Sequence, residues 1–230
     1  MPHKIIIDGC NAAGDTEKAV KLALHNQNDA EVVVIQGAQG AAKPIIAAGK
    51  DLTWSRAEQP EQGKDGYAWD ILYKEASSSE KKVTVVTLGT VTDLAIALFR
   101  YEDLKQYVEK IIMLGGSAEA GNLLPFGEAN VARDAYACQT VLQSGIPVWM
   151  IGLDAAERSG VEFDGSLAVA AALCPEIAQG KEYYVRVDTA PGEMYGRTIA
   201  DIRLHSKEEK NVRVIEKIEK ELYEKLMKEA

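Results

Sequence analysis

Residues 5–23 read IIIDGCNAAGDTEKAVKLA, and the fold is predicted outward from this stretch. Three consecutive isoleucines followed by Asp8 are typical of a strand that is buried on both faces of a sheet. A loop of small residues follows, and Asp15 then precedes apolar residues at Ala19 and Leu22, a spacing that places them on one helical face. The stretch therefore predicts a strand, a loop and a helix in succession.

The same pattern recurs along the chain. Further apolar runs, each short enough for a strand, occupy residues 31–36, 83–88, 110–114 and 147–153, with segments between them long enough for helices. Near-continuous apolar strands that alternate with helices indicate a parallel sheet covered on both faces. We therefore predict an α/β fold with a doubly wound, mostly parallel open sheet. Ligands in such sheets bind beyond the carboxyl ends of the strands.

Two elements near the C-terminus complete the predicted fold. Alternating residues in 183–188 and 198–204, separated by a turn at Pro191-Gly192, predict a hairpin at a sheet edge. The last stretch predicts an amphipathic C-terminal helix with a stripe formed by Ile215, Ile218, Leu222 and Leu226. Trp69 and Trp149 are interpreted as core residues. Residues 50–66 lack periodicity and predict a long surface loop.

Composition and charge restrict the classes of protein. The 230 residues are 47% apolar and are interpreted as a single domain over 1–230. A formal net charge of -9 repels phosphate backbones, so nucleic acid is not an expected partner. Three cysteines without paired spacing argue against a disulfide framework and a zinc site. The N-terminal apolar run is too short for a signal peptide or a membrane span, so we expect no membrane association and a cytoplasmic location.

Several short motifs lie at the predicted carboxyl ends of the strands. They are the acidic loop over 8–15, LGTVTDLA over 88–95, IMLGG over 112–116, and GNLLPFGEAN over 121–130 followed by Asp134. In the same order, they resemble D-x-D-x-G-x-D-D, L-G-P-L-T-N-L-A, M-G-G and G-N-x-x-x-x-A-E-F-N-x-x-x-D of the inosine-uridine nucleoside hydrolase family. The resemblance implies an enzyme that hydrolyses the N-glycosidic bond of ribonucleosides to ribose and free base.

The resemblance spans most of the chain. Residues 148–154 are similar to the family strand V-x-M-V-G-L-D, and residues 163–165, Phe-Asp-Gly, lie where the family has H-D-P. Two blocks found in longer family members are missing, one near residues 28–30 and one between residues 154 and 164. We therefore expect a shortened, divergent member of the family.

The resemblance also implies a calcium ion and a ribose site. The positions that match calcium ligands are Asp8, Asp15, the Leu88 carbonyl and Asp164, a set of oxygen donors that suits this ion. The positions that match ribose ligands are Asn122, Glu128 and Asn130. The positions that match catalytic residues are Asp8, Asp15 and Cys10. The expected partner is a small-molecule nucleoside or ribose, and because family members associate, a homo-oligomer is compatible with the resemblance.

Three positions depart from the family pattern. Cys10 stands where the family's general base is a carboxylate, Gly14 where a ribose-binding Asp is expected, and Phe163 where a His protonates the leaving base. A thiol is a soft ligand that is poorly matched to calcium. Retained residues also have structural explanations, such as Asp15 capping a helix. Three hypotheses stay open: an active ribonucleoside hydrolase, a catalytically degenerate ribose- or nucleoside-binding protein without a competent general base, and an assembly subunit that keeps only the scaffold.

Overall fold

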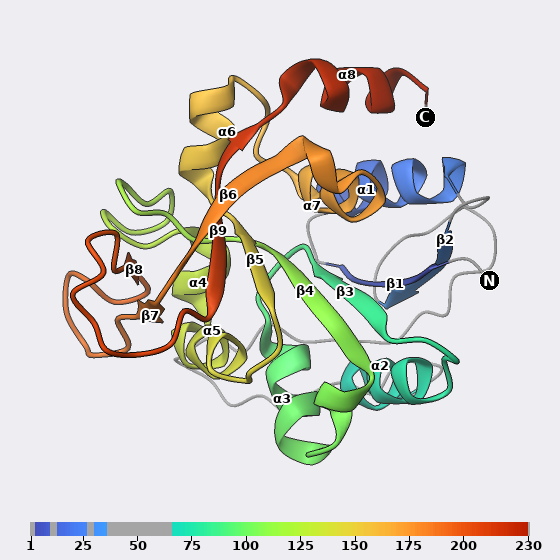
Figure 1. Ribbon diagram of the computed structural model, residues 1–230, viewed down its shortest axis with the longest axis horizontal. Coiled ribbons are helices and arrows are strands. Elements are labelled where there is room, and N and C mark those ends of the chain that lie inside the picture. The colour runs from blue at the N-terminus through green and yellow to red at the C-terminus, as the bar shows by residue number, and fades with distance from the viewer. Residues whose placement is uncertain (1–2, 10–12, 27–29, 36–65, 230) are drawn as a thin grey trace.

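A seven-stranded sheet forms the centre of the computed structural model, which describes residues 3–9, 13–26, 30–35 and 66–229 (Figure 1). The strands are β1 His3–Asp8, β2 Ala30–Ile35, β3 Val83–Thr87, β4 Val108–Leu114, β5 Val148–Ile151, β6 Ala178–Tyr183 and β9 Val212–Ile218. Their order is β2-β1-β3-β4-β5-β9-β6, and every neighbouring pair is parallel except β9 with β6. The predicted doubly wound, mostly parallel sheet is confirmed.

Helices cover both faces of this sheet (Figure 1). One face carries α2 Ala68–Ser77, α3 Thr92–Arg100 and α5 Ala135–Leu142, and the other carries α1 Ala13–His25, α6 Leu153–Ser159, α7 Gly165–Leu173 and α8 Lys220–Lys228. Shorter helical turns are η1 Leu104–Gln106, α4 Ala129–Arg133 and η2 Pro175–Ile177. Alternation along β1 sends Ile6 into the first core, and Ile5 and Ile7 into the second. This is why the strands are apolar at every position.

The hairpin predicted after residue 183 is confirmed. It consists of β7 Val185–Val187 and β8 Thr198–Ala200, paired antiparallel in a two-stranded sheet of their own. The backbone N–H of Val187 donates to Gln139 Oε1 at 2.6 Å, which attaches the hairpin to α5. The antiparallel edge of the main sheet is formed by β6 instead.

The C-terminal helix is shorter than predicted. Ile215 and Ile218 belong to β9, and α8 begins only at Lys220. The register of β6 against β9 shifts between Gln179 and Gly180, so that Gly180 pairs with Ile215 and Gln179 with Lys217. This bulge interrupts the two-residue alternation, which gave the buried isoleucines a helix-like spacing of three.

Two further apolar residues differ from expectation. Leu222, placed on the helical stripe, is 44% exposed, and α8 instead buries Tyr223. Trp69 lies in the core as predicted, whereas Trp149 is only partly buried, and the cations of Lys110 and Arg213 lie over its ring at 4.7 and 4.5 Å. Long basic side chains therefore cover what the sequence suggested would be a core indole.

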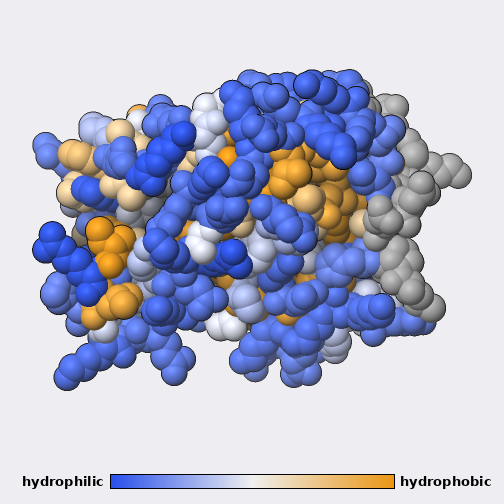
Figure 2. Space-filling view, turned by 45° about the horizontal axis from the view of Figure 1, so that its top comes forward, coloured by the Kyte–Doolittle hydropathy of each residue, from blue (hydrophilic) through white to orange (hydrophobic). Residues whose placement is uncertain are grey.

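The remaining surface is mainly hydrophilic on the side that Figure 2 shows, with apolar residues exposed in places. No helix within the described ranges is long and apolar enough to span a membrane. The loop predicted over residues 50–66 falls almost wholly in residues 36–65, outside the described part of the chain.

Candidate functional site

The candidate site lies where the order of strands reverses. β1 has β2 on one side and β3 on the other, so the crossovers leave in opposite directions, and in open α/β sheets ligands bind beyond the carboxyl ends of the strands at such a switch point. Asp8 ends β1 and pairs in register with Thr87. The N–H of Leu88 donates to the main-chain oxygen of Asp8 at 2.9 Å. Asp8, a buried residue that is 2% exposed, and the first residue after β3 are therefore joined at this point through their main chains.

The side chain of Asn130 bonds to the main chain at the carboxyl ends of β3 and β4. Its Nδ2 donates to the Leu114 carbonyl at 3.0 Å and to the Leu88 carbonyl at 3.4 Å. No described residue donates a hydrogen bond to its Oδ1, and the side chain is only partly buried. The amide is thus held by its nitrogen, and its oxygen is left as an acceptor for a ligand.

Glu128 organises the turn that presents Asn130. It is 1% exposed and caps α4, accepting from the N–H of Asn130 at 3.0 Å and of Val131 at 3.3 Å. It also accepts from the N–H of Gly116 at 3.0 Å. Burial raises the pKa of Glu128 against the opposing effect of these backbone donors. The carboxylate that the sequence suggested for ribose is therefore bonded to three backbone N–H groups.

The glycine pair after β4 makes this contact possible. Gly116 has a φ of 90°, and a Cβ there would lie 2.8 Å from Met150 Sδ. A side chain at this position would be strained and would collide with β5. A Cβ at Gly115 would lie 3.2 Å from Glu128 Oε2, so the close approach to Glu128 explains the first glycine and the close approach to Met150 the second.

Asn122 lies at the same helix start. Its Oδ1 accepts from the N–H of Ala129 at 2.8 Å, while the residue as a whole is exposed. The structure thus gathers all three predicted ribose residues, Asn122, Glu128 and Asn130, around the first turn of α4. Glu128 differs from the two amides because its carboxylate points into the protein rather than toward solvent.

The second and fourth motifs are also joined directly. Thr92 Oγ1, at the start of α3, donates to Asp134 Oδ2 at 2.7 Å. Asp134 Oδ1 in turn accepts from the N–H of Ala137 and caps α5. The contact fixes the β3 turn against the segment that carries Asn130.

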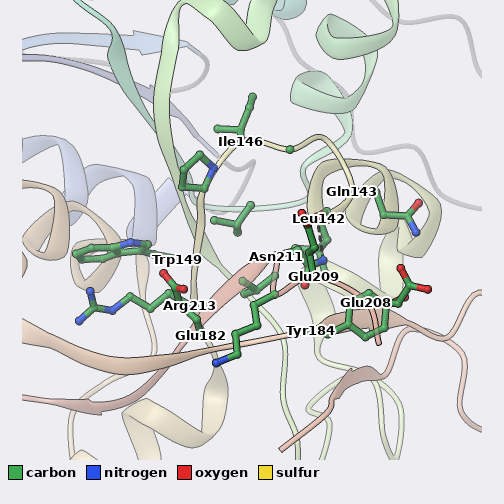
Figure 3. A pocket seen from close by; sticks show the side chains of 15 residues that line it. Leu142, Gln143, Ile146, Trp149, Glu182, Tyr184, Glu208, Glu209, Asn211 and Arg213 are labelled. Atoms are coloured by element: carbon green, nitrogen blue, oxygen red, sulfur yellow. Dashed lines mark hydrogen bonds between the residues drawn. The ribbon is translucent and has the colours of Figure 1, made fainter. Parts of the chain in front are cut away.

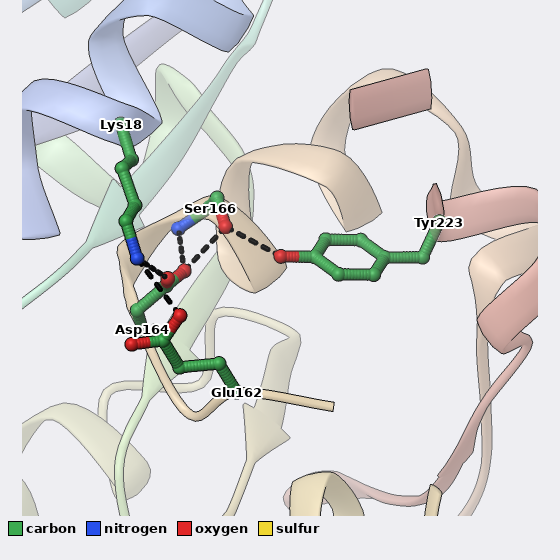
Figure 4. Close-up of polar contacts among 5 residues, drawn as sticks. All are labelled: Lys18, Glu162, Asp164, Ser166 and Tyr223. Carbon is green, nitrogen blue, oxygen red and sulfur yellow. Dashed lines mark hydrogen bonds and ion pairs between the residues drawn. The ribbon is translucent and has the colours of Figure 1, made fainter. Parts of the chain in front are cut away.

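Asp164 lies in a separate polar cluster at the start of α7 (Figure 4). Its Oδ1 accepts from the N–H of Ser166 at 2.9 Å and from the Ser166 hydroxyl, which also bonds the Tyr223 hydroxyl at 2.6 Å. Its Oδ2 accepts from Lys18 Nζ at 3.0 Å, and Glu162 Oε2 lies 2.8 Å from the same nitrogen. The hydrogen bonds that Lys18 donates to Glu162 and Asp164 raise the pKa of Lys18.

Two predicted catalytic side chains, those of Cys10 and Asp15, lie outside the described part of the structure. Cys10 is outside the described residues, and of Asp15 only the backbone, in the first turn of α1, is described. The described members therefore form one connected group around Asp8, Leu88 and Asn130, with Asp164 tied to α1 through Lys18.

The sequence did not single out Lys18 or the role of Asp154. Lys18 lies three residues after Asp15, so helical spacing places both on one side of α1; that signal could have identified it. Asp154 follows β5 and accepts from the Ser117 hydroxyl at 3.0 Å and the Ala118 N–H at 2.6 Å. It anchors the loop that leads toward Asn122.

A cleft lies near the amino ends of β5 and β9 (Figure 3). Its volume is about 550 Å³, and its lining includes Ile146, Trp149 and Arg213 near the amino ends of β5 and β9. None of the predicted site residues contributes to it.

Comparison with known proteins agrees with the motifs. The profile of the family "Inosine-uridine preferring nucleoside hydrolase" matches residues 7–165. The chain belongs to this family. The pyrimidine-specific ribonucleoside hydrolase RihA of Escherichia coli (strain SMS-3-5 / SECEC) is 31% identical over 156 residues, which cover 62% of this chain and 48% of RihA. The non-specific ribonucleoside hydrolase RihC of Escherichia coli O127:H6 is 28% identical and covers 81% of this chain and 74% of RihC.

Solved structures share the fold. The purine-preferring ribonucleoside hydrolase from Gardnerella vaginalis superposes with a TM-score of 0.84 at 20% identity, covering 98% of this chain and 97% of that one. The inosine-uridine preferring nucleoside hydrolase from Bacillus anthracis gives a TM-score of 0.77 at 17% identity, covering 99% and 100%. By sequence, this nucleoside hydrolase family member spans about half the length of the RihA proteins it matches.

The donors expected for calcium do not fit a divalent cation as described. Within the described ranges, no three His, Cys, Asp or Glu residues are grouped so that they could hold a metal ion. The Leu88 carbonyl is already bonded by Asn130, and the outer oxygen of Asp164 is paired with the ammonium of Lys18. Ca²⁺ takes six to eight oxygen ligands, and the described residues do not group such a set here, so we derive no chemical step from the ion.

Proposed function

We propose that this chain hydrolyses the N-glycosidic bond of ribonucleosides at the carboxyl edge of its sheet, releasing ribose and the free base. One observation carries the proposal: the carboxylate residue Asp8, the Leu88 carbonyl and the Asn130 amide meet at the β1/β3 switch point. Membership of the family supports it, as do relatives that are named ribonucleoside hydrolases.

In this proposal Asp8 is the general base. Glycosidic cleavage passes through an oxocarbenium-like state, and a positioned carboxylate takes a proton from the attacking water. The water oxygen bonds to C1′ as the bond from C1′ to the base nitrogen breaks. The bonding electrons leave with the base.

The proton for the leaving base comes from solvent. His3 begins β1, His25 ends α1, and His205 lies between β8 and β9, so each is away from the carboxyl ends of β1 and β3. With no histidine at these strand ends, departure of a basic leaving group is the difficult step in this scheme.

Two amides hold the ribose in this scheme. The Oδ1 of Asn130, to which no described residue donates, accepts from one hydroxyl of the sugar. Asn122 uses its oxygen on the Ala129 N–H, which leaves its Nδ2 to donate to a second hydroxyl. Glu128 acts through its neighbours, because its carboxylate fixes the N–H groups of the turn that carries Asn130.

A second candidate is a ribose- or nucleoside-binding protein without catalysis. The thiol of Cys10 at the position of the family's base favours it. The two can be separated by incubating the protein with uridine and inosine, measuring free base by chromatography, and measuring binding of ribose by calorimetry. Base release that is lost in Asp8→Asn supports hydrolysis; saturable binding without release supports the rival, and neither supports a scaffold subunit.

Three broader expectations stay predictions. They are the single domain over residues 1–230, the cytoplasmic location and the homo-oligomer. Nothing in the fold described above depends on them.

A further inference from the structure

The cation nearest Asp164 is a side chain of the protein itself. Lys18 Nζ lies 3.0 Å from Asp164 Oδ2 and 2.8 Å from Glu162 Oε2 (Figure 4). Lys18 lies on α1, three residues after Asp15 and five after the start of the helix at Ala13. The ammonium therefore reaches Asp164 from α1, the helix that begins within the stretch that the family resemblance assigns to calcium.

Several contacts hold the Asp164 side chain in one orientation. The Asp164 side chain is 3% exposed, and its inner oxygen is fixed by the N–H and hydroxyl of Ser166. The Ser166 hydroxyl is itself held by Tyr223 from α8. The outer oxygen of Asp164 is thus aimed at α1, and the bond to Lys18 fills that direction.

The charge of Lys18 also opposes a second cation at Asp164. An unperturbed lysine is charged at neutral pH, and its ammonium here satisfies two carboxylates at hydrogen-bond distance. A divalent cation bound to Asp164 Oδ2 would have to displace the ammonium or lie beside it, where the two positive charges repel each other at short range.

We propose that Lys18 supplies at Asp164 the positive charge that the family resemblance assigns to a divalent ion, so that this chain takes up no calcium at Asp164. The inference does not rest on the proposed hydrolysis. It implies that Lys18 neutralises one of the two negative charges of Asp164 and Glu162 at all calcium concentrations.

Removal of the ammonium should open a cation site. In Lys18→Met the two carboxylates that now face one nitrogen lose their partner, and oxygen donors grouped in this way attract Ca²⁺. Lys18→Gln also removes the charge but keeps a polar side chain, and it replaces Lys18→Met in the experiment if that variant unfolds. The matched control is Lys21→Met on the same helix, since Lys21 is 66% exposed and pairs with Glu17.

The experiment compares thermal unfolding and calorimetric titration with CaCl₂, using NaCl at equal ionic strength as the blank. Wild type and Lys21→Met should show no calcium binding and no rise in Tm. Lys18→Met or Lys18→Gln should bind Ca²⁺ at least about tenfold more tightly than wild type and gain stability from it. Tight calcium binding by wild type, or no gain in either Lys18 variant, would overturn the proposal. Because the readout is binding, loss of hydrolysis would not be confused with either result.

Discussion

Asn130 Nδ2 donates a hydrogen bond to the Leu114 carbonyl at 3.0 Å, and this bond sets the amide across the carboxyl ends of β3 and β4. In Asn130→Ala the ligand-facing oxygen is lost, and KM for a nucleoside should rise about tenfold to hundredfold, the worth of one or two hydrogen bonds. Steady-state kinetics with uridine measures this. Gln143→Ala, an exposed amide at the far edge of the sheet, should leave KM unchanged, and an unchanged KM in Asn130→Ala would remove that residue from the ribose site.

Asp8 should matter for the rate more than for binding. Replacing it with Asn keeps the size and removes the proton acceptor, so kcat should fall by about 10²–10⁴ while ribose binding is retained. Single-turnover measurement of base release, beside calorimetry with ribose, separates the two effects. Full activity in Asp8→Asn would mean that another group deprotonates the water.

The leaving group should limit the reaction. No histidine lies at the carboxyl ends of β1 and β3. A leaving group that departs without protonation does not need an acid at this place. We expect p-nitrophenyl riboside to be cleaved at least about tenfold faster than uridine. Equal rates, or a faster reaction with uridine, would show that an acid is present in the site.

Glu128 should contribute to stability through its backbone donors. In Glu128→Gln an amide nitrogen replaces one acceptor oxygen and faces N–H groups of the turn, including that of Gly116. Unfolding in denaturant should show a loss of about 1–3 kcal/mol. The exposed Glu102→Gln is the control and should be neutral. A neutral Glu128→Gln would show that the turn does not need the carboxylate.

The same residue predicts a pH dependence. Burial raises the pKa of Glu128 in the folded state above its unfolded value, so the folded state binds this proton more tightly. The contribution of Glu128 to the free energy of unfolding is then fully present below its pKa in the unfolded state, about 4.3. It is lost as the pH rises through the pKa of Glu128 in the folded state. The stability difference between wild type and Glu128→Gln should therefore shrink as pH increases from about 4. A difference that grows with pH would contradict this sign.

Much of the fold could be predicted because its signals are local. The isoleucines of β1 and the motif turns each identify an element from a few residues, and the strands were located to within a few positions. The C-terminus could not be predicted in this way, since a bulge opposite Gly180 gave Ile215 and Ile218 a helical spacing. A bulge depends on the partner strand, which the sequence of β9 alone does not reveal.

The sequence predicted that certain residues would lie together but not which hydrogen bonds they make, and their role as ribose ligands stays a prediction. Asn122, Glu128 and Asn130 meet at α4, yet only the structure shows that Glu128 bonds backbone N–H groups. Lys18 was missed because its partners, Glu162 and Asp164, are more than 140 residues away. Cys10 and the side chain of Asp15 stay predictions.

The most direct test of the site is a crystal of the protein grown with ribose. We predict electron density for the sugar at the ends of β1 and β3, with one hydroxyl within hydrogen-bond distance of Asn130 Oδ1 and another near Asp8. Ribose bound elsewhere, such as in the cleft beside Trp149, with the ends of β1 and β3 free of sugar, would contradict the assignment of this edge as the nucleoside site.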